Sequence, residues 1–256
     1  MEKKINGNKN SYHGCFMKII NNPAMVLLAK NAGMNFLFYD MEHGMFSFNE
    51  IHTMSLIAKP NDIDIFVRVP ECTKGYISRA LDAGATAVMV PMVETVEQAK
   101  TLVEWSKYPP IGKRGYAGGA NTYYAPSGNH ETNMKNMNSK TLTIAQIETC
   151  KGLENAKEII SMNGIDAIIV GPADLSISLG IPDNKDEIKL IEEISKIQQL
   201  CMQHDKYFGI IGKISLLEKF SNYIQIMVSA IDINCITESL KSYEKEYERI
   251  ERKEMV

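Results

Sequence analysis

The feature that most constrains the fold is the alternation of strand-length apolar runs with helix-like segments along all 256 residues. Parallel strands need such crossovers, because a tight turn cannot join them. The expected strands are about 13–17, 36–40, 64–69, 87–90, 142–147, 167–170, 207–211 and 224–228. Eight strands in a chain of this length, without an internal repeat or a linker, predict one (β/α)8 barrel domain over residues 1–256.

Local signals support the intervening helices. Pro23 suits the first turn of a helix that ends at Gly33, and residues 47–50 have the form of a capping box. Residues 107–140 are polar and rich in Asn and Gly, which predicts a long loop or arm that covers the site or contacts another subunit. Residues 237–256 predict a charged C-terminal helix.

Charge and composition exclude several classes of function. A net charge of −3 gives no electrostatic reason to expect nucleic acid or an anionic membrane as a partner. The apolar runs are far shorter than the roughly 20 residues of a membrane helix, and residues 1–10 lack the apolar core of a signal peptide. The five cysteines are scattered, without a Cys-x-x-Cys pair. We therefore expect a cytoplasmic protein.

Four of the expected strands end on ionisable residues. The strand at 36–40 ends on Asp40 and is followed by His43, and the strand at 64–69 ends near Arg68. Glu148 and Asp174 come directly after the strands at 142–147 and 167–170. In a barrel of this kind the carboxyl ends of the strands meet at one face, where active sites are built. These side chains are therefore expected to share one site.

Glu148 and Asp174 are the candidate ligands of a metal ion. A hard divalent cation such as Mg2+ prefers oxygen ligands and commonly takes only one or two carboxylates from the protein. Water and substrate oxygens then complete its coordination. Spacing alone leaves a second role open, in which each acid is salt-bridged or, like Asp174, stabilises the start of a helix.

Arg68 and His43 are candidates for the chemistry itself. An inward-pointing Arg68 would be buried and would need an anionic partner. Its planar fork suits a substrate carboxylate or an enolate oxygen, and the structural alternative is an internal ion pair with Asp82. Asp40 precedes His43 by three residues, so it could fix the imidazole tautomer and raise its basicity for proton transfer. A purely structural histidine is the alternative.

Two other barrel chemistries find less support. A Schiff-base aldolase needs a lysine inside the barrel, but the strand at 167–170 has none and Lys213 lies beyond the strand at 207–211. Many barrels bind phosphate with glycine-rich loops after the last two strands, and here residues 211–213 and 229–231 are poor in glycine. The helix start at Gly171 offers backbone N–H groups that suit a carboxylate.

Several motifs agree in order and spacing with one known family. They are DMEHG at 40–44, RVP at 68–70, LDAGA at 81–85, VP at 90–91, YPPIGKRG at 108–115, QIET at 146–149 and VGPADLS at 170–176. With these motifs the chain resembles the HpcH/HpaI aldolase family, the metal-dependent 2-oxo-acid aldolases and their relatives. The resemblance covers about residues 14–226.

The resemblance implies a site and a reaction. Glu148 and Asp174 would hold Mg2+ or Mn2+, or else Co2+, and a pyruvate-like 2-oxo acid would chelate that metal. The substrate would also contact Gln146, Gly171, Pro172, Ala173 and Asp174. Arg68 would stabilise the enolate, and the His43–Asp40 pair would move the proton of the aldol hydroxyl. Glu42 and Asp82 would contact these residues, rather than the substrate, and hold them in position. Neither an organic cofactor nor a Schiff-base lysine is implied.

The family also implies a homo-oligomer, usually a hexamer built as a trimer of dimers, in which C-terminal helices exchange between neighbours. Two segments depart from its pattern, residues 115–120 and residues 230–232, and both lie where the second substrate or a neighbouring subunit would bind. Three functions therefore remain open. They are aldol cleavage or condensation of a 4-hydroxy-2-oxo acid, metal-independent condensation of oxaloacetate with acetyl-CoA as in siderophore-pathway citrate synthases, and non-catalytic binding of a 2-oxo acid.

Overall fold

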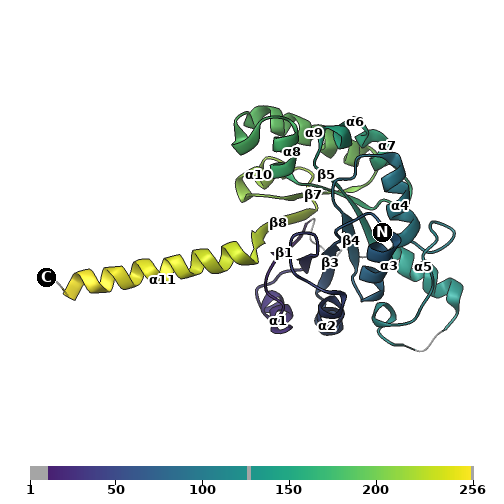
Figure 1. Cartoon of the computed structure of the whole chain (residues 1–256), viewed down its shortest axis with the longest axis horizontal. Helices are drawn as coiled ribbons and strands as arrows, with labels where there is room; N and C mark the ends of the chain where they lie inside the picture. The colour runs from purple at the N-terminus through teal and green to yellow at the C-terminus, as the bar shows by residue number, and fades with distance from the viewer. Residues whose placement is uncertain (1–10, 126–127, 255–256) are drawn as a thin grey trace.

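The computed structural model describes residues 11–125 and 128–254. Within them, eight parallel strands close into a barrel in which β8 pairs back onto β1 (Figure 1). The predicted (β/α)8 fold is therefore confirmed. The strands are β1 (Tyr12–Met17), β2 (Phe36–Asp40), β3 (Asp64–Arg68), β4 (Ala87–Val90), β5 (Leu142–Ile147), β6 (Ala167–Val170), β7 (Tyr207–Ile211) and β8 (Ile226–Ile231).

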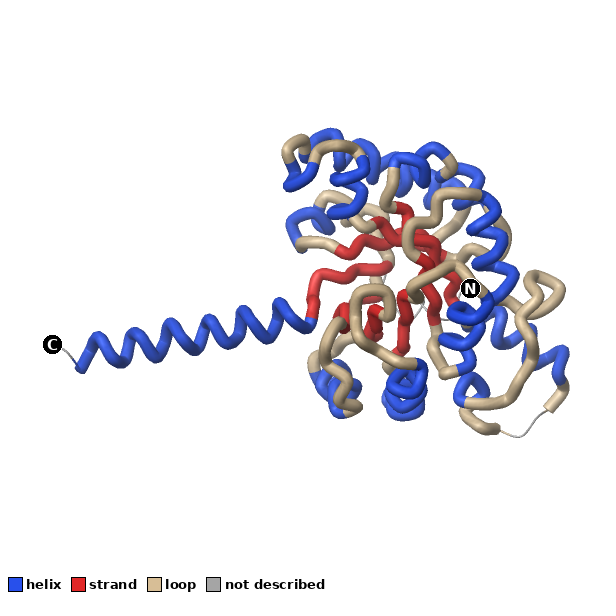
Figure 2. The backbone as a smooth tube through the Cα atoms, viewed as in Figure 1, coloured by secondary structure: helices blue, strands red, loops and turns tan. Residues whose placement is uncertain are grey.

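Helices surround the barrel and connect successive strands (Figure 2). The α-helices are α1 (Ala24–Asn31), α2 (Phe48–Ala58), α3 (Lys74–Asp82), α4 (Val96–Ser106), α5 (His130–Lys140), α6 (Cys150–Glu154), α7 (Ala156–Ser161), α8 (Pro172–Ser178), α9 (Glu187–Gln203), α10 (Ile214–Glu218) and α11 (Asp232–Glu254). Short 3-10 helices are η1 (Lys59–Asn61), η2 (Ala120–Thr122) and η3 (Pro182–Asn184). None of the described helices is both long and apolar enough to span a membrane.

Alternate residues of each strand face the barrel interior. This two-residue period determines which side chains reach the site. Phe36, Phe38 and Phe66 pack together inside, with the Phe36 and Phe66 rings stacked 4.3 Å apart. Continuing the same alternation, Asp40 and Arg68 follow on the inner side, and they are paired in register across β2 and β3. Leu37 and Tyr39 belong instead to the larger core between strands and helices.

Most predicted boundaries agree with the structure, and the capping box at Ser47 and Glu50 is confirmed. Two elements differ: β8 ends at Ile231 rather than near residue 228, and α11 begins at Asp232 rather than near residue 237. The strand continues because Ala230 and Ile231 pair with β1. The last residues of the predicted tail, 255–256, lie outside the described residues.

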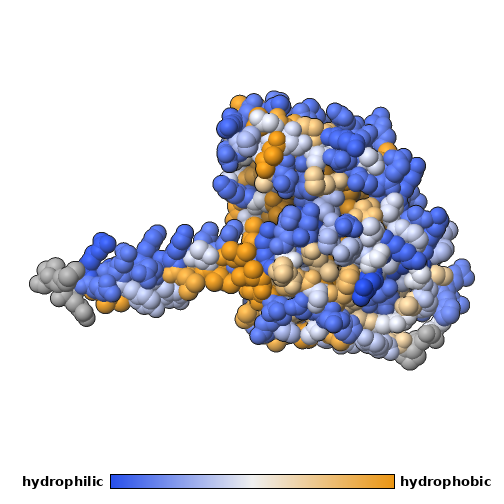
Figure 3. Space-filling model, viewed as in Figure 1, coloured by the Kyte–Doolittle hydropathy of each residue, from blue (hydrophilic) through white to orange (hydrophobic). Residues whose placement is uncertain are grey.

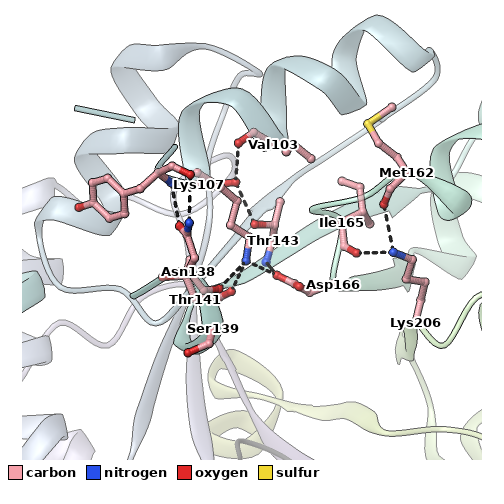
Figure 4. Close-up of polar contacts among 12 residues, drawn as sticks. Val103, Lys107, Asn138, Ser139, Thr141, Thr143, Met162, Ile165, Asp166 and Lys206 are labelled. Carbon is pink, nitrogen blue, oxygen red and sulfur yellow. Dashed lines mark hydrogen bonds and ion pairs between the residues drawn. The ribbon is translucent and has the colours of Figure 1, made fainter. Parts of the chain in front are cut away.

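Residues 107–140 do not cover the predicted site, so that part of the prediction was wrong; the other part, an arm that contacts another subunit, stays a prediction. This segment joins the end of α4 to the start of β5, so it lies at the amino ends of the strands, the face opposite the predicted site. It also contains α5 and η2. Figure 4 shows how it is fastened: the buried Lys107 Nζ donates to the Thr141 carbonyl at 2.6 Å and pairs with Asp166 at 2.6 Å.

The last helix, α11, projects away from the barrel (Figure 1). Its base is anchored by the buried Asp232, whose Oδ2 accepts the backbone N–H groups of Lys18, Ile19 and Ile20. Beyond that base it carries an exposed apolar stripe, visible as hydrophobic patches along the helix in Figure 3. The stripe consists of Ile233, Ile236, Leu240, Tyr243, Tyr247 and Ile250.

Candidate active site

Asp40 and Arg68 form a buried ion pair at the carboxyl ends of β2 and β3. The Arg68 Nε donates to Asp40 Oδ1 at 2.9 Å and its Nη2 to Asp40 Oδ2 at 2.7 Å. Burial alone would raise the pKa of Asp40, but the hydrogen bonds and charge of Arg68 outweigh it, so the pKa is below its ordinary value. Asp40 is therefore a carboxylate that orients Arg68, whose guanidinium also lies 5.1 Å from the Phe16 ring.

The predicted side-chain pair between His43 and Asp40 is not present. Asp40 Oδ1 accepts the backbone N–H groups of Glu42 and His43, at 3.1 and 3.3 Å. The His43 imidazole is 62% exposed, and its Nε2 lies 3.7 Å from Glu42 Oε2. This occurs because the turn after β2 directs the main chain, rather than the imidazole, toward Asp40. Glu42 is thus the carboxylate nearest to the imidazole, and it also pairs with Arg68 Nη1 at 3.1 Å.

Glu148 is held rigidly by its neighbours at the end of β5. Its Oε1 accepts the backbone N–H of Met92 at 3.0 Å, and its Oε2 accepts Gln146 Nε2 at 2.6 Å. Glu148 is 2% exposed. Burial, opposed by the Met92 hydrogen bond and reinforced by the nearby charge of Asp174, raises the pKa of Glu148 to about 7. Arg68 and Glu42 also act on this carboxylate, so charges from four strand ends meet here.

The turn from β6 into α8 leaves space for that carboxylate. A Cβ on Gly171 would overlap the Glu148 Oε2 atom and would lie 2.8 Å from Gln146 Nε2. Gly171 and Pro172 are buried, whereas Ala173 and Asp174 are exposed at the start of α8. The first N–H groups of a helix have no partners within it. The start of α8 therefore offers hydrogen-bond donors and an exposed carboxylate.

These residues are suited to a hard divalent cation. Among the described residues, no group of three or more His, Cys, Asp and Glu side chains could hold a metal ion. Mg2+ needs fewer, since it usually binds through one or two carboxylates and keeps its other positions for water and substrate oxygens. Glu148 and Asp174 supply two carboxylates; burial and, after it, their mutual repulsion raise the pKa of Glu148. A bound cation would relieve that repulsion.

The structure places two other predicted site residues, Gln146 and Asp82, in different parts of the barrel. Gln146 is buried beside Glu148, and its Oε1 has no hydrogen-bond partner among the described residues. Asp82, predicted to support the site, instead pairs with Arg114 at 2.6 Å near the opposite face of the barrel. That prediction was wrong because α3 runs antiparallel to the strands, which places its last residue away from their carboxyl ends.

The structure adds residues that the sequence pattern did not single out. Lys18, just after β1, has its Nζ 3.8 Å from Asp40 Oδ2. Met92, after β4, has a left-handed φ of 48°, and in this conformation its N–H points to Glu148. Both residues follow the carboxyl end of a strand. A search of the residues after all eight strands, for lysines and for residues next to a proline, would have found them.

Comparison with known proteins gives a consistent assignment. The family model of HpcH/HpaI aldolase/citrate lyase matches residues 13–226. A 2-keto-3-deoxy-L-rhamnonate aldolase of Escherichia coli O9:H4 (strain HS) is 36% identical over 160 residues, which cover 62% of this chain and 60% of that protein. The chain thus matches about three fifths of the length of this relative.

Two solved structures are similar over nearly the whole chain. One is the HpcH/HpaI aldolase from Desulfitobacterium hafniense DCB-2, with 28% identity, a TM-score of 0.88, and coverage of 93% of this chain and 92% of that one. The other is the citrate synthase SbnG, with 26% identity, a TM-score of 0.82, and coverage of 93% and 94%. Together with the match of the family model over residues 13–226, the barrel and the site at its strand ends show that this chain belongs to the HpcH/HpaI aldolase/citrate lyase family.

Proposed function

We propose that this protein is a carbon–carbon lyase that cleaves a 4-hydroxy-2-oxo acid into pyruvate and an aldehyde, or condenses the two, with the help of a divalent metal. The buried Glu148 carries the proposal. It lies beside Asp174, and its pKa is raised to about 7 by burial and by that second acid. A carboxyl pair of this kind at the mouth of a barrel is suited to a cation and a chelating 2-oxo acid.

Glu148 and Asp174 would hold the cation, which would polarise the keto oxygen of the substrate and offset the negative charge of the enolate. The N–H groups of Ala173 and Asp174 would donate to the substrate carboxylate. Arg68 carries more N–H donors than Asp40 and Glu42 use, and the remaining donors would stabilise the enolate oxygen. Because the ion pair with Asp40 holds the Arg68 guanidinium in place, Arg68 needs no rearrangement during the reaction.

The proton of the aldol hydroxyl would pass to His43. As that proton leaves the oxygen at C4, the C3–C4 bond breaks, the aldehyde forms, and the bonding electrons move into the enolate of pyruvate. The imidazole is exposed, so it can reach a substrate in the mouth of the barrel and exchange its proton with solvent. Glu42, 3.7 Å from His43 Nε2, would stabilise the protonated imidazole.

A second function has specific support. The citrate synthase SbnG has a similar structure at 26% identity, and residues 230–232, at the end of β8 and the start of α11, depart from the aldolase pattern. Condensation of oxaloacetate with acetyl-CoA is therefore the alternative. It would use the same enolate-stabilising residues but a thioester as the second substrate.

One set of assays separates these functions from non-catalytic binding. Purified protein would be incubated with a panel of 4-hydroxy-2-oxo acids, and pyruvate would be detected with lactate dehydrogenase, with EDTA and after Mg2+ or Mn2+ is restored. Thiol release from acetyl-CoA with oxaloacetate would be measured in parallel. Our proposal requires metal-dependent pyruvate release that Glu148→Gln abolishes. Metal-independent thiol release would favour the synthase, and binding of oxalate without turnover would indicate a non-catalytic barrel.

We also propose that the protein is a homo-oligomer, namely a hexamer, in which α11 of one subunit binds a second copy of the chain. The six apolar residues of its stripe recur at alternating intervals of three and four, the spacing of one helix face. Leu240 in the middle of the stripe is 65% exposed. An isolated helix with such a face gains stability by burying it against a protein surface.

A further inference from the structure

One cation in the mouth of the barrel has no role in the reaction as described so far. Lys18 follows β1, and it belongs to none of the motifs that carry the family resemblance. Its side chain is 30% exposed, and its Nζ lies 3.8 Å from Asp40 Oδ2. That distance allows an ion pair but is too long for a hydrogen bond. No described residue accepts a hydrogen bond from this ammonium group, although it has three N–H donors.

Asp40 has its hydrogen bonds without Lys18. Its two oxygens accept two hydrogen bonds from Arg68 and two from backbone N–H groups. Lys18 and Arg68 lie near the same ring, that of Phe16, with Lys18 Nζ 6.0 Å and Arg68 Cζ 5.1 Å from its centroid. Arg68 is buried, whereas Lys18 reaches solvent. Lys18 is therefore an accessible positive charge beside the enolate-stabilising arginine.

The main chain that carries Lys18 is firmly held. The N–H groups of residues 18–20 all donate to the buried Asp232. On its other side this segment meets the turn after β2, since a Cβ on Gly44 would lie 3.1 Å from the Lys18 carbonyl oxygen. His43 immediately precedes Gly44. Lys18 and His43 thus belong to two neighbouring turns that touch each other.

The order of the strands places Lys18 across the barrel from the candidate metal ligands. In a closed barrel of eight strands, β1 and β2 lie opposite β5 and β6. Glu148 and Asp174 follow β5 and β6, whereas Lys18 and His43 follow β1 and β2. A 2-oxo acid bound at Glu148 and Asp174, with its C4 hydroxyl at His43, therefore extends toward the side of Lys18. The part of the substrate that reaches this side is the substituent on C4, which leaves with the aldehyde.

A carboxylate is the anionic group that best suits this lysine. An ammonium group is a compact point charge that pairs with a single anionic oxygen. Two carboxylates, Asp40 and Glu42, lie on the same side of the site. They repel a group with one negative charge less than a phosphate monoester, which carries about −1.5 to −2.

We propose that Lys18 binds a second carboxylate, carried by the substituent on C4, so that it selects a 4-hydroxy-2-oxo diacid as substrate. The aldehyde that is released then carries that carboxylate. This assignment rests on the proposed function for the orientation of the substrate. It also suits the alternative reaction, since oxaloacetate is itself a 2-oxo diacid.

Isothermal titration calorimetry with uncleavable analogues tests this role of Lys18. 2-Oxoglutarate and 2-oxoadipate are diacids of different length, and 2-oxopentanoate and 2-oxohexanoate are monoacids with the same numbers of carbon atoms. None of them has a hydroxyl group at C4, so aldol cleavage cannot consume them. Each would be titrated, with Mg2+ present, into the full chain and into Lys18→Met, Lys18→Arg and Lys100→Met. Lys100 is an exposed lysine of α4, so its replacement is a matched loss of one charge.

We expect at least one diacid to bind about tenfold to a hundredfold more tightly than its monoacid counterpart, the factor expected for one charge-assisted hydrogen bond. Lys18→Met should bring this ratio close to one, whereas Lys18→Arg and Lys100→Met should retain most of it. Because the ratio is compared, a general loss of affinity does not imitate the effect. The role of Lys18 is overturned if neither diacid binds more tightly than its counterpart, or if Lys18→Met leaves the ratio unchanged.

Failure of the proposed function is detected separately. Exchange of the pyruvate methyl protons with deuterium, measured on the unmodified protein with Mg2+, reports the enolate chemistry and needs no second carboxylate. A preference for diacids that depends on Lys18, without such exchange, would overturn the lyase reaction and support the role of Lys18. Exchange without any preference for diacids would overturn the role of Lys18 alone.

Discussion

The ion pair between Asp40 and Arg68 determines which groups remain available for chemistry. Both residues are buried, and Arg68 gives Asp40 two hydrogen bonds. A carboxylate in this position has little capacity left to act on His43, which leaves Glu42 as the carboxylate nearest to the imidazole. Removing one member of a buried pair leaves the other charge without its partner, and this is usually far more costly than losing a surface pair.

Asp40→Asn should therefore destabilise the fold by about 3–5 kcal/mol near neutral pH. The pKa of Asp40 is lowered in the folded state. Its contribution to the free energy of unfolding is therefore fully present above the ordinary pKa that Asp40 has in the unfolded chain. It is lost as the pH falls through the lower, folded value. Urea unfolding at several pH values should show the largest difference between the two proteins near neutrality, and a smaller one below about pH 4. A constant difference would contradict this account, and Asp62→Asn, at an exposed acid, is the control.

Gly171 is required by space rather than by backbone conformation. A methyl group there would overlap the Glu148 carboxylate, so Gly171→Ala should displace that side chain. A shift of about 1 Å in a reacting group can lower turnover roughly a hundredfold. We expect such a loss in pyruvate release, with a thermal midpoint close to that of the unmodified protein. Gly75→Ala, in α3, where a Cβ meets no atom closer than 4.0 Å, should leave turnover unchanged.

His43 can be separated from the groups that stabilise the enolate. If it handles only the hydroxyl proton, His43→Ala should lower carbon–carbon cleavage by about a hundredfold to ten-thousandfold. Decarboxylation of oxaloacetate has no hydroxyl to deprotonate and should be largely retained. Glu42→Gln should show the same selectivity more mildly, because the imidazole remains. Parallel assays of both reactions provide the measurement, and an equal loss of both would show that His43 positions the 2-oxo acid.

At the scale of elements, the barrel was predictable because strand periodicity and helix-start signals act locally. β2, β4, β5, β6 and β7 have the bounds expected from their apolar runs. The end of β8 was not predictable, because its last residues are held by pairing with β1, across a bulge between Gly14 and Cys15. Pairings between distant strands leave no local pattern.

The site was predictable only in part, for a related reason. The alternation of strand residues brings Arg68, Gln146 and Glu148 to the inner face, as the sequence implied. The partners of each side chain depend on turns, which strand periodicity does not describe. The turn after β2 directs the His43 imidazole outward, and the end of α3 carries Asp82 to the other face.

The exposed stripe of α11 predicts self-association. Leu240→Glu places a charge in the middle of the stripe, which should separate the subunits while leaving the barrel folded. Light scattering after size-exclusion chromatography should then report a mass near the 28.7 kDa of one chain, with an unchanged near-UV spectrum. Lys245→Ala, a charged exposed position of α11, should keep the assembly intact. A monomeric unmodified protein would contradict the proposal.

At the scale of the whole molecule, the two faces of the barrel have different properties. The carboxyl face gathers Asp40, Arg68, Glu148 and Asp174 into one electrostatically coupled group. The amino face is covered by the segment between α4 and β5, which lines a cavity of about 590 Å³ there.

The most direct test of the proposed chemistry is exchange of the pyruvate methyl protons with deuterium, followed by proton NMR in D2O. This measurement detects the enolate without requiring the aldehyde to be known. We predict that the protein with Mg2+ or Mn2+ depletes the methyl signal, that EDTA stops this, and that Glu148→Ala and Asp174→Ala do not catalyse it, whereas His43→Ala does. Exchange no faster than in buffer with the same metal, or exchange that continues undiminished in EDTA, would contradict the assignment of a metal-assisted pyruvate lyase.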